Sequence, residues 1–225
     1  MRCFFSSARQ LYTDYVATMR AVVAVTSVLF FNVAFSPIAN AQQIKSPAQY
    51  QQCAACHGAS GEGNPSLNAP AIAGLSQTYL ARQLVNFHSG IRGSDSQDTL
   101  GQQMQAMTKG LDKDKDIPVL VAYLANLTPV NVAQQTQGDL TNGTRYYQGK
   151  CGACHGGQAQ GNEAFNAPRL AGQDIDYLKR QMHNFATGLR GTHSEDKYGR
   201  QMAMMAKTTS GKELDDILHY IAVQE

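Results

Sequence analysis

The pentapeptide C-x-x-C-H occurs twice in this 225-residue chain, at residues 53–57 and again 98 residues later at 151–155. Two cysteines in this spacing, followed at once by a histidine, form the attachment signature of a c-type haem. The two thiols add across the haem vinyl groups, and the histidine takes an axial position on the iron. We therefore predict two covalently bound haem c groups, held by Cys53, Cys56, His57, Cys151, Cys154 and His155.

Three other uses of paired cysteines fit the sequence less well. A zinc ribbon sets its cysteine pairs about 15–20 residues apart, far closer than here. A thioredoxin-like dithiol usually begins a helix after a strand, and no such strand pattern precedes either motif. A structural disulfide is the simplest alternative in an exported protein, but it does not explain why a histidine follows both pairs.

The first 41 residues are typical of an export signal. They contain a basic segment that ends at Arg20, an apolar run over residues 21–35, and an A-x-A cleavage pattern at residues 39–41. The apolar run is too short to span a bilayer. We expect cleavage near Ala41 and a periplasmic protein. Cys3 leaves with the signal, so the two motifs hold all four remaining cysteines.

The charge balance of the remaining chain excludes one class of function. Residues 42–225 contain 16 basic and 16 acidic side chains. A protein that binds nucleic acid needs a basic surface to displace counterions. We therefore expect no nucleic-acid partner.

The sequence around the two motifs also repeats. Under a shift of 98 residues, about half of the positions between Cys53 and Met107 are identical. Self-similarity at a fixed period indicates one structural unit that occurs twice. The matched stretches include Asn68-Ala69-Pro70 with Asn166-Ala167-Pro168, Tyr79-Leu80 with Tyr177-Leu178, and Gly90, Arg92 and Gly93 with Gly188, Arg190 and Gly191.

Each copy is predicted to contain three helices: one that ends at the C-x-x-C-H motif, a second amphipathic helix, and a last one. In the last helix of the first copy, apolar residues recur at helical spacing from Ile117 to Leu124. Pro118 is tolerated only in a first turn, which places the start of that helix near residues 114–116. No convincing alternating strands are present. We predict an all-α protein with a signal peptide at residues 1–41, domains at 42–128 and 139–225, and a linker at 129–138.

The second axial ligand decides whether each iron carries electrons or binds a substrate. Met104 lies 47 residues after His57, and Met202 repeats that spacing in the second copy. A thioether ligand raises the redox potential and closes the iron to substrates. Met107 and Met205 are also in step, so the repeat by itself does not choose between the two pairs. We expect both pairs in a loop before the last helix.

The remaining histidines and four arginines have simpler interpretations. The histidines are out of step with one another under the repeat, so we expect surface or structural roles for them. The arginines could pair with haem propionates, although exposed helix and loop charges explain them equally well. The histidines are His88, His183, His193 and His219, and the arginines are Arg82, Arg92, Arg180 and Arg190.

Two further stretches follow each C-x-x-C-H motif, N-x-P and then Y-L-x-x-Q in a predicted helix. With these features the chain after the signal resembles the dihaem cytochrome c4 family. The resemblance implies two tandem class I cytochrome c domains, each wrapped around one covalent haem. In that family the methionine of a G-x-Q-M stretch is the ligand, which favours Met104 and Met202. The resemblance also implies that the carbonyls of Pro70 and Pro168 accept the Nδ1–H of the axial histidines.

These features predict a periplasmic dihaem cytochrome that carries single electrons between redox partner proteins, from a respiratory or dehydrogenase donor to a terminal oxidase-type acceptor. We expect no small-molecule substrate, and peripheral membrane association stays open. One alternative is a cytochrome subunit of a dehydrogenase complex. Another is a dihaem enzyme of the peroxidase or thiosulfate-oxidising type, which needs an iron with a displaceable or cysteine ligand. Differences between the copies, such as Ala81 against Lys179, predict two unequal redox potentials.

Overall fold

The computed structural model describes residues 45–131 and 134–224. The predicted signal peptide at residues 1–41 lies outside this part of the chain. All named elements in the described residues are helices, and the only β-pairing there consists of two isolated bridges. The prediction of an all-α fold is confirmed.

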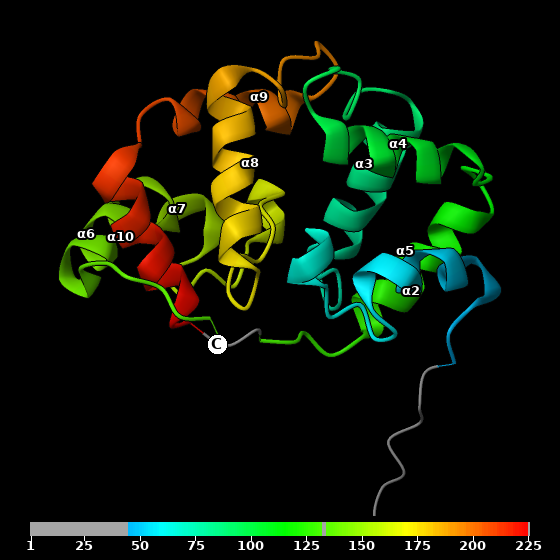
Figure 1. Ribbon diagram of the computed structural model, residues 1–225, viewed down its shortest axis with the longest axis horizontal. Helices are drawn as coiled ribbons and strands as arrows, with labels where there is room; N and C mark the ends of the chain where they lie inside the picture. The colour runs from blue at the N-terminus through cyan, green and yellow to red at the C-terminus, as the bar shows by residue number, and fades with distance from the viewer. Residues whose placement is uncertain (1–44, 132–133, 225) are drawn as a thin grey trace, which may run out of the picture. The chain divides into compact units, whose positions relative to one another are not determined.

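The two copies of the repeat fold into matching series of helices (Figure 1). The first copy contains the 3-10 helix η1 (Ala48–Tyr50), α2 (Gln51–His57), the 3-10 helix η2 (Pro65–Leu67), α3 (Gln77–His88), α4 (Thr99–Lys109) and α5 (Asp116–Asn126). The second copy contains α6 (Leu140–Lys150), α7 (Gly152–His155), the 3-10 helix η3 (Glu163–Phe165), α8 (Ile175–Thr187), α9 (Lys197–Ala206) and α10 (Gly211–Ala222).

The helices that carry the methionines differ from the prediction. Met104 lies on α4 and Met202 on α9, so the expectation of a loop before the last helix is wrong. Each helix begins at an aspartate whose carboxylate accepts a backbone N–H three residues later, from Asp98 to Gly101 and from Asp196 to Gly199. Such a cap satisfies one of the free N–H groups at a helix start. Each copy therefore has a fourth helix.

The motif helix differs between the copies. In the first copy α2 runs without a break to His57. In the second copy α6 ends at Lys150, and the short α7 begins at Gly152. Glycine is among the poorest helix formers, and Gly149 and Gly152 both lie at this break. The second copy therefore reaches its histidine through a broken helix.

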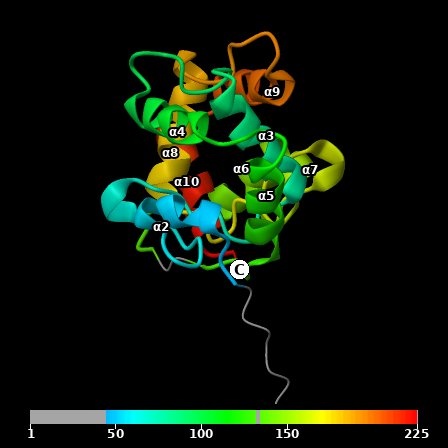
Figure 2. The ribbon, with the colours of Figure 1, turned by 90° about the vertical axis from the view of Figure 1, so that its right-hand side faces the viewer.

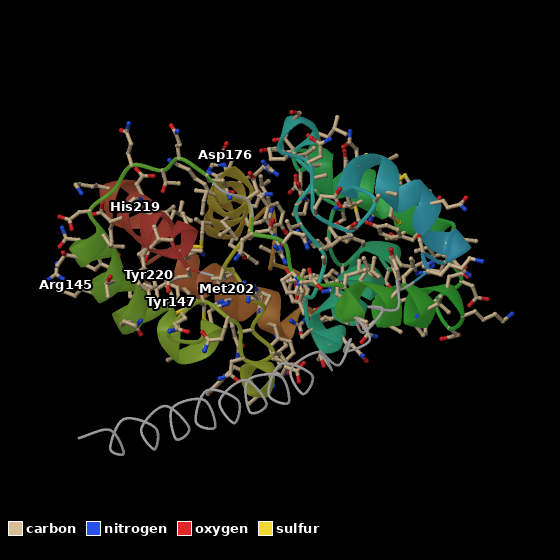
Figure 3. All side chains as sticks on the ribbon, turned by 90° about the horizontal axis from the view of Figure 1, so that it is seen from below. Arg145, Tyr147, Asp176, Met202, His219 and Tyr220 are labelled. Atoms are coloured by element: carbon tan, nitrogen blue, oxygen red, sulfur yellow. The ribbon has the colours of Figure 1, made fainter. Side chains whose placement is uncertain are left out.

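Each half has its own apolar core. The first core joins α3 and α5 around Tyr50, and the second joins α6, α8 and α10 around Tyr147. The ring of Tyr50 packs on that of Tyr123, with 5.1 Å between centroids, and Tyr147 packs on Tyr220 at 4.8 Å. Figure 3 shows the second pair side by side. Burial of these aromatic and aliphatic faces is the main stabilising contribution within each half.

The helices are arranged so that α3 and α8 face each other between the two halves (Figure 1). Figure 2 views the protein from the side of the first half, where α4 lies away from α2 and α5. The described residues between α5 and α6 form no helix, in the region of the predicted linker. Within residues 45–131 and 134–224, none of the helices is long and apolar enough to cross a membrane.

Candidate haem-binding sites

The four motif cysteines have free thiols, and none of these four forms a disulfide in the structure. In each motif the first cysteine is partly buried against the core of its half and the second is exposed. Burial raises the pKa of the Cys53 thiol, and it raises that of Cys151 to about 11. A raised thiol pKa is the opposite of the lowered pKa that is typical of the nucleophile in a thiol–disulfide exchange site.

The histidines of the two motifs are buried at the ends of their helices. Burial lowers the pKa of both His57 and His155, which favours neutral imidazole rings. The Nδ1 atom of His57 lies 2.9 Å from the carbonyl oxygen of Pro70, and that of His155 lies 2.9 Å from the oxygen of Pro168. A carbonyl only accepts, so Nδ1 carries the proton and Nε2 keeps a lone pair that can bind iron.

A short loop brings each proline carbonyl to its histidine. In the first copy Asn64 and Ala69 exchange two backbone hydrogen bonds of 2.8 and 3.0 Å. Between them the chain turns through η2 and then through Asn68, whose backbone is left-handed with φ 55°. Asparagine tolerates this conformation better than most residues. The second copy repeats the loop with Asn162 and Ala167, which explains why the N-A-P stretch occurs in both.

The methionines of α4 and α9 fall into two groups by exposure. Met104 and Met202 are partly buried. Met107 and Met205 expose 43% and 40% of their surfaces. Members of the first group therefore have less contact with solvent, which is the property expected of an axial ligand closing a haem pocket. Figure 3 labels Met202 on α9, in the same half as Tyr147 and Tyr220.

Four arginines gather between α3 and α8. Two of them are buried, contrary to the alternative of exposed charges, and the other two are partly buried. Arg92 and Arg190 are buried, each exposing 8% of its surface. The guanidinium of Arg92 donates to Gln83 of its own half at 2.7 Å and to Gln181 of the other half at 3.0 Å. Arg190 donates to the same two glutamines, at 2.9 Å to Gln83 and 2.7 Å to Gln181. Arg92 also reaches the hydroxyl of Tyr177 at 3.4 Å.

The other two arginines cross between the halves in a reciprocal way. Arg82 of α3 donates to the carbonyl oxygen of Asn166 at 2.8 Å, and Arg180 of α8 donates to that of Asn68 at 3.0 Å. Each asparagine belongs to the loop that presents the proline carbonyl. Each half thus supports the histidine loop of the other.

The arginine cluster also offers a test of whether the site fits haem. The Nε atoms of Arg82, Arg92, Arg180 and Arg190 are all buried without a hydrogen-bond partner. Among the described residues, none of the four forms an ion pair with a carboxylate. Buried cations and donors without partners are costly. Haem c carries two propionates, and carboxylates are the partners that such guanidinium groups lack. The residues present fit two haem groups.

The haem-binding motifs can be recognised in the sequence, whereas the arginine contacts between the two halves cannot. The arginines and their glutamine partners, Gln83 and Gln181, are visible in the repeat, but their contact across the halves is not. The repeat does contain a hint, because both glutamines and both buried arginines are in step. A polar residue conserved between two copies of a repeat, at a position with no role in its own helix, is a candidate for contact between them.

The chain is similar in sequence to known cytochromes over most of its length. The family model for cytochrome c matches residues 44–128 and 140–224. Cytochrome c4 of Azotobacter vinelandii is 30% identical over 178 residues, which cover 75% of this chain and 82% of the relative. The thiosulfate dehydrogenase electron acceptor of Thiomonas intermedia is 32% identical over 184 residues, which cover 76% of this chain and 78% of the relative.

A solved structure gives the same result. The reduced recombinant cytochrome c4 from Pseudomonas stutzeri superposes with a TM-score of 0.63 at 26% identity. The match covers 79% of this chain and 95% of that one. The two matched segments of the family model coincide with the two copies of the repeat. This confirms the predicted tandem fold and the two covalent haem c groups.

Proposed function

We propose that this protein is a periplasmic one-electron carrier. The chain belongs to the cytochrome c family, as a dihaem protein of the cytochrome c4 type, and this membership is the premise of the proposal. A bound haem c supplies a ferric/ferrous couple. The observation that supports this proposal is that both halves present the same set of groups. Each half has two cysteines, a neutral histidine oriented by a proline carbonyl, and a partly buried methionine on a later helix. A carrier needs these groups and nothing that binds a substrate.

In this proposal each group of the chain has one task. The cysteines of each motif hold the haem by thioether bonds. His57 and His155 bind iron through Nε2, and the carbonyls of Pro70 and Pro168 fix the planes of their rings. Met104 and Met202 would supply the remaining iron ligands, one for each haem.

The same ligand set argues that the protein transforms no substrate. A methionine on each iron leaves no open coordination position. An enzyme of the peroxidase or thiosulfate-oxidising type needs a displaceable or cysteine ligand, and residues 42–225 hold no cysteine outside the two motifs.

The domains that we assign are 42–128 and 139–225, joined by a linker at 129–138.

The partners that we propose are proteins. The donor is a respiratory complex or a dehydrogenase, and the acceptor is an oxidase-type protein that receives single electrons. The predicted export signal at residues 1–41 supports a periplasmic location. Peripheral association with a membrane is compatible with this role.

A second candidate concerns the donor. The relative from Thiomonas intermedia is named as an electron acceptor of thiosulfate dehydrogenase. We propose by analogy that such a dehydrogenase is one donor, either as a transient partner or with this chain as its permanent cytochrome subunit. The protein would still be a carrier, because the thiosulfate chemistry would take place on the dehydrogenase.

The test uses protein purified from periplasm. Intact mass should equal residues 42–225 plus two haem groups, and the oxidised spectrum should contain a methionine-to-iron charge-transfer band. The reduced protein should not bind carbon monoxide rapidly and should not turn over peroxide or thiosulfate alone. Rapid carbon monoxide binding at one haem, together with turnover of either substrate, would establish the enzyme alternative instead. Reduction by thiosulfate only when a thiosulfate dehydrogenase is added would support the second candidate.

A further inference from the structure

One side chain of the second half reaches the histidine loop of the first half and has no counterpart in the other direction. The side chain of Gln173 and residue Ala71 are both buried. The N–H of Ala71 donates to Gln173 Oε1 at 2.9 Å, and Gln173 Nε2 donates to the carbonyl oxygen of Ala71 at 2.8 Å. The glutamine amide thus pairs with both backbone groups of a single residue.

The N–H of Ala71 belongs to the same peptide group as the carbonyl of Pro70. That carbonyl accepts the Nδ1–H of His57 at 2.9 Å. One trans peptide group therefore connects the two hydrogen bonds in a row, from His57 through Pro70 and Ala71 to Gln173. Hydrogen bonds in such a row polarise one another. Donation of the Ala71 N–H to Gln173 makes the Pro70 oxygen a better acceptor.

Gln173 is itself held firmly in the second half. It directly precedes Asp174, the residue that caps α8 by accepting the N–H of Tyr177. The N–H of Asp174 donates to the same Oε1 atom at 3.0 Å. The backbone N–H of Gln173 donates to the carbonyl oxygen of Leu170 at 3.1 Å. The amide is therefore fixed before it meets the first half, and little conformational entropy is lost in the contact.

In the part of the chain that the structure describes, the second site lacks this support. Under the 98-residue repeat, Gln173 matches Leu75 and the Pro70–Ala71 peptide matches Pro168–Arg169. A leucine side chain has no polar atom, so Leu75 cannot pair with the second peptide. The hydrogen bond from His155 to Pro168 has the same length as its counterpart. Among residues 45–131 and 134–224, no side chain continues the row beyond the Pro168–Arg169 peptide.

We propose that Gln173 is a positioning residue for the first haem site only, and that it lowers the redox potential of that site relative to the potential without it. A carbonyl that accepts more strongly draws the Nδ1 proton of His57 and makes Nε2 a better electron donor. A stronger donor favours the ferric state. This inference rests on the proposed function, in which His57 is an axial ligand.

The test replaces Gln173 in the full-length dihaem protein. Gln173→Leu introduces the residue of the first copy and removes both hydrogen bonds. NMR redox titration follows each haem through its own methyl resonances. We expect an upward shift of the first potential, an unchanged second potential, and exchange of the Ala71 amide proton faster by about tenfold, the effect of losing one hydrogen bond. The Nδ1 proton of His57 should also shift while that of His155 does not.

A second variant and a matched control separate positioning from loss of packing. Gln173→Glu keeps an acceptor for the Ala71 N–H and adds negative charge, so its first potential should lie at or below the wild-type value. Simple damage to the interface would move both variants in the same direction. Leu75→Met alters the matching position without touching either peptide row, and should leave both potentials unchanged.

Two results would overturn the inference. One is a first potential in Gln173→Leu equal to that of the wild type, and the other is an equal shift at both haems. Intact mass and the charge-transfer band are measured on the same samples. Absence of a haem or of methionine ligation in the wild type would reject the proposed function and this inference together, whereas two intact haems with unmoved potentials would reject the inference alone.

Discussion

Replacement of the methionines on α4 separates the proposed ligand from its neighbour one turn away. Met104→Ala should remove about half of the methionine-to-iron charge-transfer band, because two equivalent sites contribute to it. The potential of the first haem should fall, and that iron should bind carbon monoxide or cyanide. Met107→Ala should leave the band intact.

The cost in stability of the second variant follows from its exposure. Truncation of a fully buried methionine to alanine costs about 2–5 kcal/mol. Met107 has 43% of its surface in solvent, so a smaller part of its side chain is removed from packing. We expect the free energy of unfolding to fall by roughly 1–2 kcal/mol, because less apolar area is lost from the protein interior.

The assays are absorption spectra of both variants, potentiometric titration, and denaturant unfolding. Met202→Ala and Met205→Ala provide the matched pair on α9. Loss of the band in Met107→Ala together with its survival in Met104→Ala would refute the ligand assignment. A loss of 4 kcal/mol or more in Met107→Ala, with the band retained, would refute the reasoning from exposure.

Three further changes test the surrounding fold. Tyr50→Phe should lower the free energy of unfolding by about 1–2 kcal/mol in denaturant titration, because the partly buried carbonyl of Gly58 loses its 2.7 Å donor; an unchanged midpoint would show that water replaces it. Gly61→Ala should cost about 1–2 kcal/mol in the same assay, because φ is 70° there; equal stability would mean that the loop relaxes. The N–H of Asp139 and the Lys212 ammonium hold the pKa of Asp216 below its usual value. Its stabilisation is present above the unfolded pKa of about 3.9 and is lost as pH falls. Asp216→Asn should therefore be less stable than the wild type at pH 7, with the difference shrinking in acid; a difference independent of pH would contradict this.

The sequence predicts those parts of the fold that depend on local patterns. The start of α5 at Asp116 agrees with the position inferred from Pro118. The residues Ile117, Leu120, Val121 and Leu124 lie in the core, as their helical spacing indicates. Such features are readable because neighbours along the chain determine them.

The features that the sequence does not predict depend on distant residues or on weak local signals. The stretch over α4 contains three glutamines and Gly101, and Leu100, Met104 and Met107 are its only large apolar residues, so its helical signal is weak. Its start is determined by the Asp98 cap. Gln173 looks like an ordinary polar residue before a helix, and only the docking of the two halves gives it a partner at Ala71.

The reciprocal arginines have a consequence for how such a chain can evolve. A tandem duplication begins with two self-sufficient units, and either can be deleted without harm to the other. Here Arg82 supports the loop at Asn166, and Arg180 supports the loop at Asn68. Deletion of one unit would leave the survivor with a loop that has lost its donor and with a guanidinium that has lost its acceptor. Simple loss of one copy would therefore remove contacts that the remaining copy uses, so the two units are no longer self-sufficient at these positions.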